Sequence, residues 1–144
     1  HGYKQQSMIK KQIDMLVEAG YPSKDIYVFM IYNFEPGYYE MLKKLKQCKK
    51  WGVQIADCRY RPLNQTYDNY NPRREQTSED YYIHSKWTDK QIKLFRKKVR
   101  QQNIMIRHGF DFYSRDLEKW GAIRREEKIS SKEINDRMLV VVDK

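Results

Sequence analysis

Apolar and polar residues recur with two different spacings along the first hundred positions of the chain. Over residues 7–19 the apolar side chains are three or four positions apart, which is the spacing of one helical face. They are Ile9, Ile13, Leu16 and Val17. Gly20 and Pro22 come next, where a helix is expected to end. An unbroken apolar run over 26–31 then predicts a strand covered on both faces, as in a parallel sheet.

The same succession of helix and strand follows once more. The second helical face consists of Tyr38, Met41, Leu42, Leu45 and Cys48, and Gly52 is its expected C-cap. The segment GVQIADCRYRPLNQ begins at that glycine and predicts a strand over 53–61. Side chains along this strand alternate between two faces. One face carries Gln54, Ala56, Cys58 and Tyr60, and the other carries Val53, Ile55, Asp57, Arg59 and Arg61.

Beyond the second strand the pattern changes. Residues 63–84 have no period, and we expect a mobile loop there. Thr88 and Gln91 form a predicted capping box, which opens a helix whose buried side is Ile92, Phe95 and Val99. A short extension or strand over 104–106 and a small helix over 115–120 are expected next. A charged segment over 122–137, with a second capping box from Ser130, precedes an LVVV run at 139–142 that predicts an edge strand or a partner-dependent tail.

The order helix, strand, helix, strand, helix predicts the α/β class. Strands joined by a crossover helix are expected to be parallel. At 144 residues the chain fits one domain with a real core, and its 12 tyrosines and 3 tryptophans argue against wholesale disorder. Apolar runs are too short for a membrane span, no signal peptide is seen, and two cysteines favour a reduced, cytoplasmic protein. The start at His1 suggests a piece of a longer protein.

Polar side chains gather where the two predicted strands end. Asn33 and Glu35 follow the first strand, and Arg59, Arg61 and Asn64 lie at the end of the second. Ligands of parallel sheets bind at the carboxyl ends of strands, and two arginines on one face can clamp a carboxylate or a phosphate. The alternative is that Arg59 pairs with Asp57 or with other neighbours, since charges on a sheet are costly without a partner.

A net charge of +10 permits binding to nucleic acid. Residues 86–107 hold eight Lys and Arg against one Asp. Two basic regions are candidates, and the alternative for each is a solvated surface. The helical stripe consists of Lys86, Lys90, Lys93, Lys97 and Arg100, and the loop mixes Arg73 and Arg74 with Tyr67, Tyr70, Tyr81 and Tyr82. The three histidines and two cysteines form no metal motif, and no catalytic residue is identified.

Three segments resemble the carboxyl-terminal half of a radical S-adenosylmethionine barrel. They are MIKKQIDMLVEAGYPSKDIYVFMIYNF, YYEMLKKLKQCKKWGVQIADCRYRPLNQTY and KWTDKQIKLFRKKVRQQ, within about residues 2–102. The resemblance implies that residues 1–121 form part of a (β/α)6 barrel and that 122–144 are a charged helical extension. It also implies a polar lumen that holds S-adenosylmethionine and substrate. Asp57, Arg59 and Arg61 would then face this lumen, and Ala56, Cys58 and Tyr60 would face the outer helices.

The chain departs from that family in two places. The family binds its [4Fe–4S] cluster through a C-x-x-x-C-x-x-C loop, whereas Cys48 and Cys58 are ten positions apart and have no third partner. Ile31, Tyr32 and Asn33 stand where the family often has a glycine. We therefore expect no cofactor in this chain alone, with the cluster and S-adenosylmethionine held by a full-length parent that supplies the upstream barrel. The alternatives are a small basic nucleic-acid-binding module and an interaction module that pairs through its LVVV tail.

Overall fold

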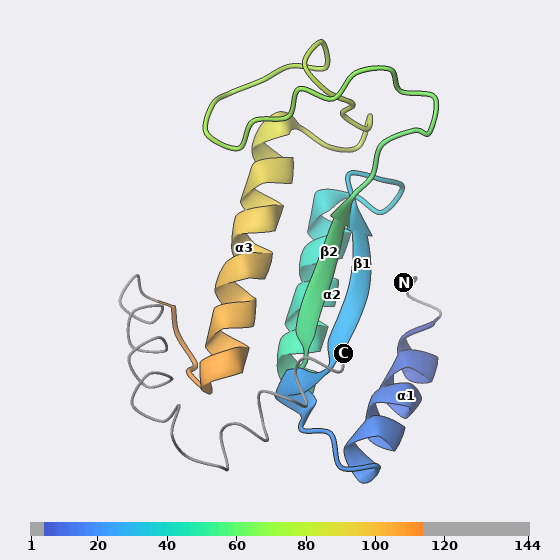
Figure 1. Ribbon diagram of the computed structural model, residues 1–144, viewed down its shortest axis with the longest axis vertical. Coiled ribbons are helices and arrows are strands. Elements are labelled where there is room, and N and C mark those ends of the chain that lie inside the picture. Colours follow the sequence, from blue (N-terminus) through green and yellow to red (C-terminus); the bar gives the residue numbers. More distant parts are fainter. Residues whose placement is uncertain (1–4, 114–144) are drawn as a thin grey trace.

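The computed structural model describes residues 5–113, and it has mixed α/β architecture (Figure 1). The elements in chain order are α1 (Gln6–Glu18), the short 3-10 helix η2 (Ser23–Asp25), β1 (Tyr27–Tyr32), α2 (Tyr38–Trp51), β2 (Gln54–Arg59) and α3 (Asp89–His108). This order confirms the helix, strand, helix, strand, helix prediction. The expected helix at 115–120, the extension at 122–144 and the LVVV run at 139–142 lie outside the described residues.

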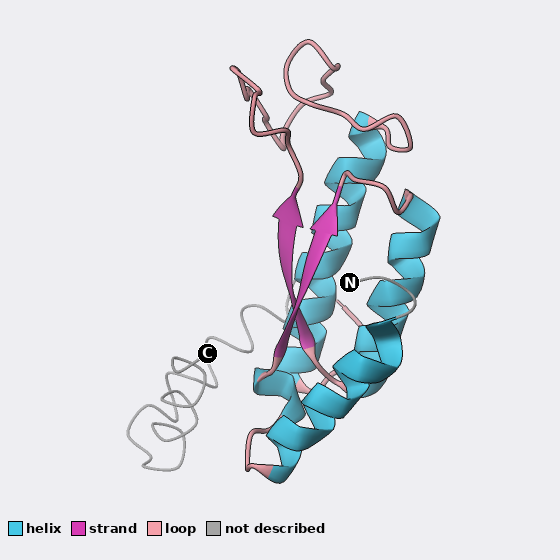
Figure 2. Cartoon of the chain, turned by 90° about the vertical axis from the view of Figure 1, so that its right-hand side faces the viewer, coloured by secondary structure: helices cyan, strands magenta, loops and turns pink. Residues whose placement is uncertain are grey.

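The two strands form a parallel sheet joined by the crossover helix α2. Their register pairs Tyr27 with Gln54 at one end and Tyr32 with Arg59 at the other. Helices α2 and α3 pack together on one face of this sheet, as Figure 2 shows from the side. Buried side chains of all three helices and both strands make one core: Ile13, Val28, Met30, Tyr32, Met41, Leu45, Cys48, Ile55, Phe95 and Val99.

The opposite face of the sheet is open, which corrects the prediction of a strand covered on both faces. In β1, Val28, Met30 and Tyr32 are buried, whereas Tyr27, Phe29 and Ile31 are 40%, 58% and 38% exposed. Their neighbours on β2, Ala56 and Cys58, are exposed as well. Both faces of β1 are apolar, so the sequence carries no alternation to distinguish them. Only the start of this face is covered among residues 5–113, where Gln54 is buried and donates to the carbonyl oxygen of Lys24.

Helix ends follow the predicted chemistry. Gly52 terminates α2 in the left-handed conformation, with φ of 70°. Thr88 and Gln91 form the expected capping box of α3. The predicted strand at 104–106 is wrong, because α3 continues through these residues to His108 and ends at Gly109. Ile104 is buried, and it is buried as part of a helix rather than as part of a strand.

None of the helices between residues 5 and 113 combines the length and the apolar character needed to cross a bilayer.

Candidate functional site

Residues 60–88 pass over the carboxyl ends of both strands and reach the first turn of α3 (Figure 1). Asn33 holds this segment to the sheet. Its side chain is fully buried, and its backbone has a positive φ of 59°, which asparagine tolerates better than most residues. The Nδ2 group donates to the carbonyl oxygens of Tyr60 at 3.2 Å and Tyr82 at 2.8 Å, and Oδ1 accepts from the backbone N–H of His84 at 2.8 Å.

The far end of the segment is held by Trp87. Its indole N–H donates to the carbonyl oxygens of Phe34 and Pro36, each at 3.0 Å. The ring packs against Tyr32 and Phe95 in the core, with centroids 6.2 and 5.7 Å away. As predicted, residues 63–84 form a loop without helix or strand, but this loop has its own hydrogen bonds and buries Tyr81 and Gln76.

Arg59 lies at the centre of the loop's inner surface. Its Nη2 donates to Oδ2 of Asp68 at 2.8 Å, and its guanidinium lies over the rings of Tyr70 and Tyr81, at 4.4 and 5.4 Å from their centroids. Arg61 reaches the same Asp68 oxygen at 3.3 Å. The hydrogen bond from Arg59 holds the pKa of Asp68 below its ordinary value, although burial opposes this shift. The two arginines therefore share an internal carboxylate.

Asp89 joins the loop to α3 in a second polar cluster. One carboxylate oxygen accepts from the Tyr81 hydroxyl at 2.6 Å and from Lys93 at 2.9 Å, and the other accepts from the backbone N–H of Gln76 at 3.0 Å. Burial tends to raise the pKa of Asp89, but the hydrogen bonds from Tyr81 and Lys93 outweigh it, so the pKa is lowered. Lys93 also donates to the carbonyl oxygen of Arg74. This cluster fixes the loop against the N-terminal turn of α3.

The six residues predicted to bind cofactor or substrate do not share one surface. Asn33 is a buried structural residue, and Glu35 is an exposed one that lies 3.8 Å from Lys86. Asn64 is exposed in the loop. Arg59 and Arg61 meet at Asp68, as described above. Asp57 is exposed on β2 and is not the ion-pair partner of Arg59, but the alternative that Arg59 pairs with another side chain holds, because its partner is Asp68.

The expected orientation of β2 is reversed. Asp57 and Arg59 are register partners of the buried Met30 and Tyr32, so they lie on the face that the helices cover. Ala56 and Cys58 lie on the open face instead of facing the helices. The alternation along this strand was predicted correctly, but its polar side was assigned to the wrong layer. Charge on that face is tolerated because Asp68 of the loop pairs with Arg59 and because Asp57 is exposed to solvent.

The predicted nucleic-acid residues are also separated by the fold. Arg73, Arg74, Lys90 and Lys97 are exposed, whereas Lys93 is held by Asp89. The loop tyrosines that could have stacked on bases make contacts within the protein, although Tyr67 is exposed. Tyr81 is fully buried, Tyr70 lies beneath Arg59, Tyr82 packs on Tyr60 and the Tyr67 hydroxyl donates to the carbonyl oxygen of Ser78.

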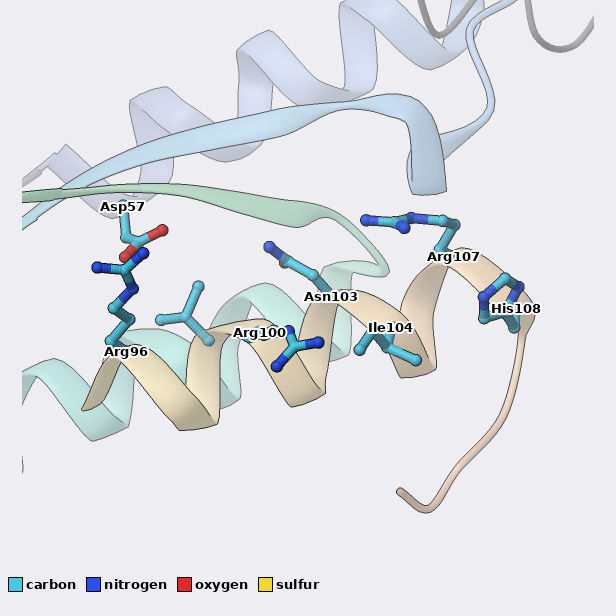
Figure 3. A pocket seen from close by; sticks show the side chains of 8 residues that line it. Asp57, Arg96, Arg100, Asn103, Ile104, Arg107 and His108 are labelled. Carbon is cyan, nitrogen blue, oxygen red and sulfur yellow. The ribbon is translucent and has the colours of Figure 1, made fainter. Parts of the chain in front are cut away.

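A groove that was not predicted runs between the free edge of β2 and α3 (Figure 3). Its lining residues from α3 are Arg96, Val99, Arg100, Asn103, Ile104, Arg107 and His108, and Asp57 contributes from β2. The side chain of Asn103 satisfies the free edge of β2 at Ile55. Its Oδ1 accepts from the Ile55 N–H and its Nδ2 donates to the Ile55 carbonyl oxygen, both at 2.8 Å. The signal that could have revealed this groove is the spacing of Arg96, Arg100, Asn103 and Arg107 on one helical face.

The chain matches no protein-family model, no curated protein and no solved structure. Among residues 5–113, no group of three His, Cys, Asp or Glu side chains is arranged to hold a metal ion.

Proposed function

We propose that this chain is a segment of a larger β/α barrel of the radical S-adenosylmethionine type, to which it contributes two strands and three helices. One observation carries the proposal: the parallel sheet is covered by helices on a single face, and its other face is apolar and open. In β/α barrels the helices surround the strands, and the second face of every strand points into the barrel. An apolar sheet face in water is costly unless further strands cover it.

The two edges of the sheet suggest where the remaining strands attach. Asn103 occupies the outer edge of β2 at Ile55, so a further strand cannot pair there without displacing it. The carbonyl groups of Ile26 and Tyr32 accept hydrogen bonds from β2. Because backbone groups alternate in direction along a strand, those of Tyr27, Phe29 and Ile31 point away from β2. We infer that β2 is the last strand of the barrel and that the upstream strands pair with β1.

This orientation changes which residues belong to the barrel interior. Phe29, Ile31, Ala56 and Cys58 would line it, which gives this part of the interior an apolar surface in place of the polar lumen that the resemblance implies. The two cysteines do not fit a cluster site. Cys48 is fully buried beneath the sheet, and Cys58 is exposed on the opposite face. Iron–sulfur ligands would have to come from other parts of a full-length parent, so the isolated chain is inactive in this proposal.

The complete reading frame that contains this chain provides the test. We expect it to encode C-x-x-x-C-x-x-C upstream of residue 1, and the protein expressed without oxygen to contain iron and sulfide in equal amounts. A complete frame without that motif, or an anaerobic protein without iron, would refute the assignment to this enzyme class.

A matched pair of variants tests the barrel geometry separately. Phe29→Lys places a charge on the open face, and Tyr39→Lys places one on the exposed surface of α2, where Tyr39 is 73% exposed. In the isolated chain both substitutions should leave the thermal midpoint nearly unchanged. In the full-length protein only Phe29→Lys should lower it strongly, because burial of an unpaired charge is costly. Equal midpoints for the two full-length variants would contradict the barrel.

A further inference from the structure

The groove between β2 and α3 adjoins a second hollow at the end of β2. The first has a volume of about 440 Å³ and the second of about 430 Å³, and both are lined by Asp57 and Arg96. Arg59, Arg61 and Asp68 form the far wall of the second hollow. The two hollows together make one trough along α3, which begins at the strand end and extends to the last turn of the helix.

Arginines dominate the α3 side of this trough. Arg96, Arg100 and Arg107 are spaced four and seven residues apart, and Figure 3 shows them on the side of the helix that borders the groove. At 1.5 Å per residue their Cα atoms are separated by about 6 Å and about 10 Å along the helix axis. Like charges at this spacing repel one another. The fold therefore concentrates positive charge along one line.

Among the described residues, Asp57 is the one acidic side chain that lines the first hollow, and in Figure 3 the guanidinium of Arg96 is turned toward it. In the second hollow the carboxylate of Asp68 is already paired with Arg59 and Arg61. Among residues 5–113 no ion pair within 4.0 Å involves Arg96 or Arg107. The edge of β2 adds a donor to the same place. The N–H of Ile55 points to this edge. Because alternate residues of a strand direct their N–H groups to the same side, the N–H of Asp57 points there as well.

We propose that this trough binds a ligand with two or more closely spaced phosphate groups. Guanidinium groups match phosphate oxygens with paired hydrogen bonds, and several arginines in line suit several phosphates better than one. Among the described residues, Tyr32 in the second hollow is the one aromatic side chain that lines the trough, against five arginines, so the phosphates would be the main group recognised. This chemistry has two sources, a free oligophosphate and the backbone of a single-stranded nucleic acid. The inference does not depend on the barrel proposed above.

Binding of tripolyphosphate and of a labelled oligothymidylate to the full chain, at low salt, tests the proposal. Arg96→Gln combined with Arg107→Gln should weaken binding at least about tenfold, since each removes charge-assisted hydrogen bonds. Asp57→Asn should strengthen binding, because it removes the negative charge from the trough. Lys50→Gln removes an equal charge from the exposed end of α2 and should leave the affinity unchanged. The thermal midpoint of each variant shows whether it is folded.

The two probes separate the sources of phosphate. Tripolyphosphate that binds without being displaced by the oligonucleotide indicates a free oligophosphate. Tight oligothymidylate binding, with a log–log salt slope of about −0.7 for each phosphate contacted, indicates a nucleic-acid backbone. Three results would overturn the proposal: neither probe binds the folded chain, Lys50→Gln weakens binding as much as the double arginine variant, or Asp57→Asn fails to strengthen it. The Asp57→Asn result decides the matter if the arginine variants do not fold.

Discussion

Asn33 shows how much one side chain can contribute to stability when it forms hydrogen bonds with three backbone groups. Asn33→Gly keeps the positive φ accessible but leaves the Tyr60 and Tyr82 carbonyls and the His84 N–H without their partner. We expect the free energy of unfolding to fall by about 2–4 kcal/mol, because each lost hydrogen bond is worth about 1 kcal/mol and the groups are partly buried. Urea denaturation measures this. Asn64→Gly, at an exposed position of the same loop, should change stability by less than about 0.5 kcal/mol.

The Arg59–Asp68 pair should make stability depend on pH in the acidic range. The pKa of Asp68 is lower in the folded chain than in the unfolded chain, where it is about 3.9. The stabilisation is therefore complete above about pH 4 and is lost as the pH falls through the folded pKa. Asp68→Asn should lower stability at pH 7 and reduce the steepness of the acid-induced loss, as measured by urea unfolding between neutral and acidic pH.

The control for this pH effect is Asp14→Asn. Asp14 pairs with Lys10 at 2.8 Å, but their side chains are 57% and 46% exposed, so the pair contributes little. If Asp68→Asn and Asp14→Asn gave the same pH profile as the parent chain, Arg59 and Asp68 would not form a stabilising pair in solution.

At the scale of elements, Asn103 connects α3 to the free edge of β2. Asn103→Leu would leave the Ile55 N–H and carbonyl without a partner and expose the edge to pairing with other chains. We expect the free energy of unfolding to fall by about 1–3 kcal/mol and aggregation to increase. Light scattering at rising protein concentration measures the aggregation. Gln101→Leu, two residues before Asn103 and therefore on a different side of α3, should produce neither effect.

Elements whose boundaries depend on local chemistry were predicted well from the sequence. Gly52 ends α2, and Thr88 opens α3, because the groups that satisfy a helix end lie within a few residues of it. The segment at 104–106 was misassigned because a short apolar run suits a strand or a helix equally. Only its packing against the core, which depends on residues far away in the chain, selects the helix.

At the scale of the whole molecule, neighbouring residues of β1 should respond very differently to truncation. Met30 is fully buried beneath the helices, and Met30→Ala should cost about 2–5 kcal/mol. Phe29 is 58% exposed on the open face, and Phe29→Ala should change the stability of the isolated chain by less than about 0.5 kcal/mol. Phe29→Ala should also reduce self-association in sedimentation experiments. A large loss of stability for Phe29→Ala would mean that this face is covered in the isolated chain.

The candidate site was harder to predict than the fold, for a physical reason. Arg59 and Arg61 were correctly placed at the end of a strand, but their partner, Asp68, belongs to a loop without a periodic pattern. Arg96 and Arg107 come together with Asp57 only after β2 and α3 have packed. Alternation along a strand separates its two faces, yet it does not reveal which face the helices will cover. That choice is made by the tertiary structure.

The positions of the two thiols provide a chemical reporter for the open face. Burial raises the pKa of Cys48 to about 12, and its side chain has no solvent exposure, so it stays protonated and shielded from reagents. Cys58 stands exposed on the opposite side of the sheet, between the residues that a covering layer would contact. A thiol-specific reagent should therefore modify the folded chain once, and the rate of that modification reports whether anything lies against the sheet.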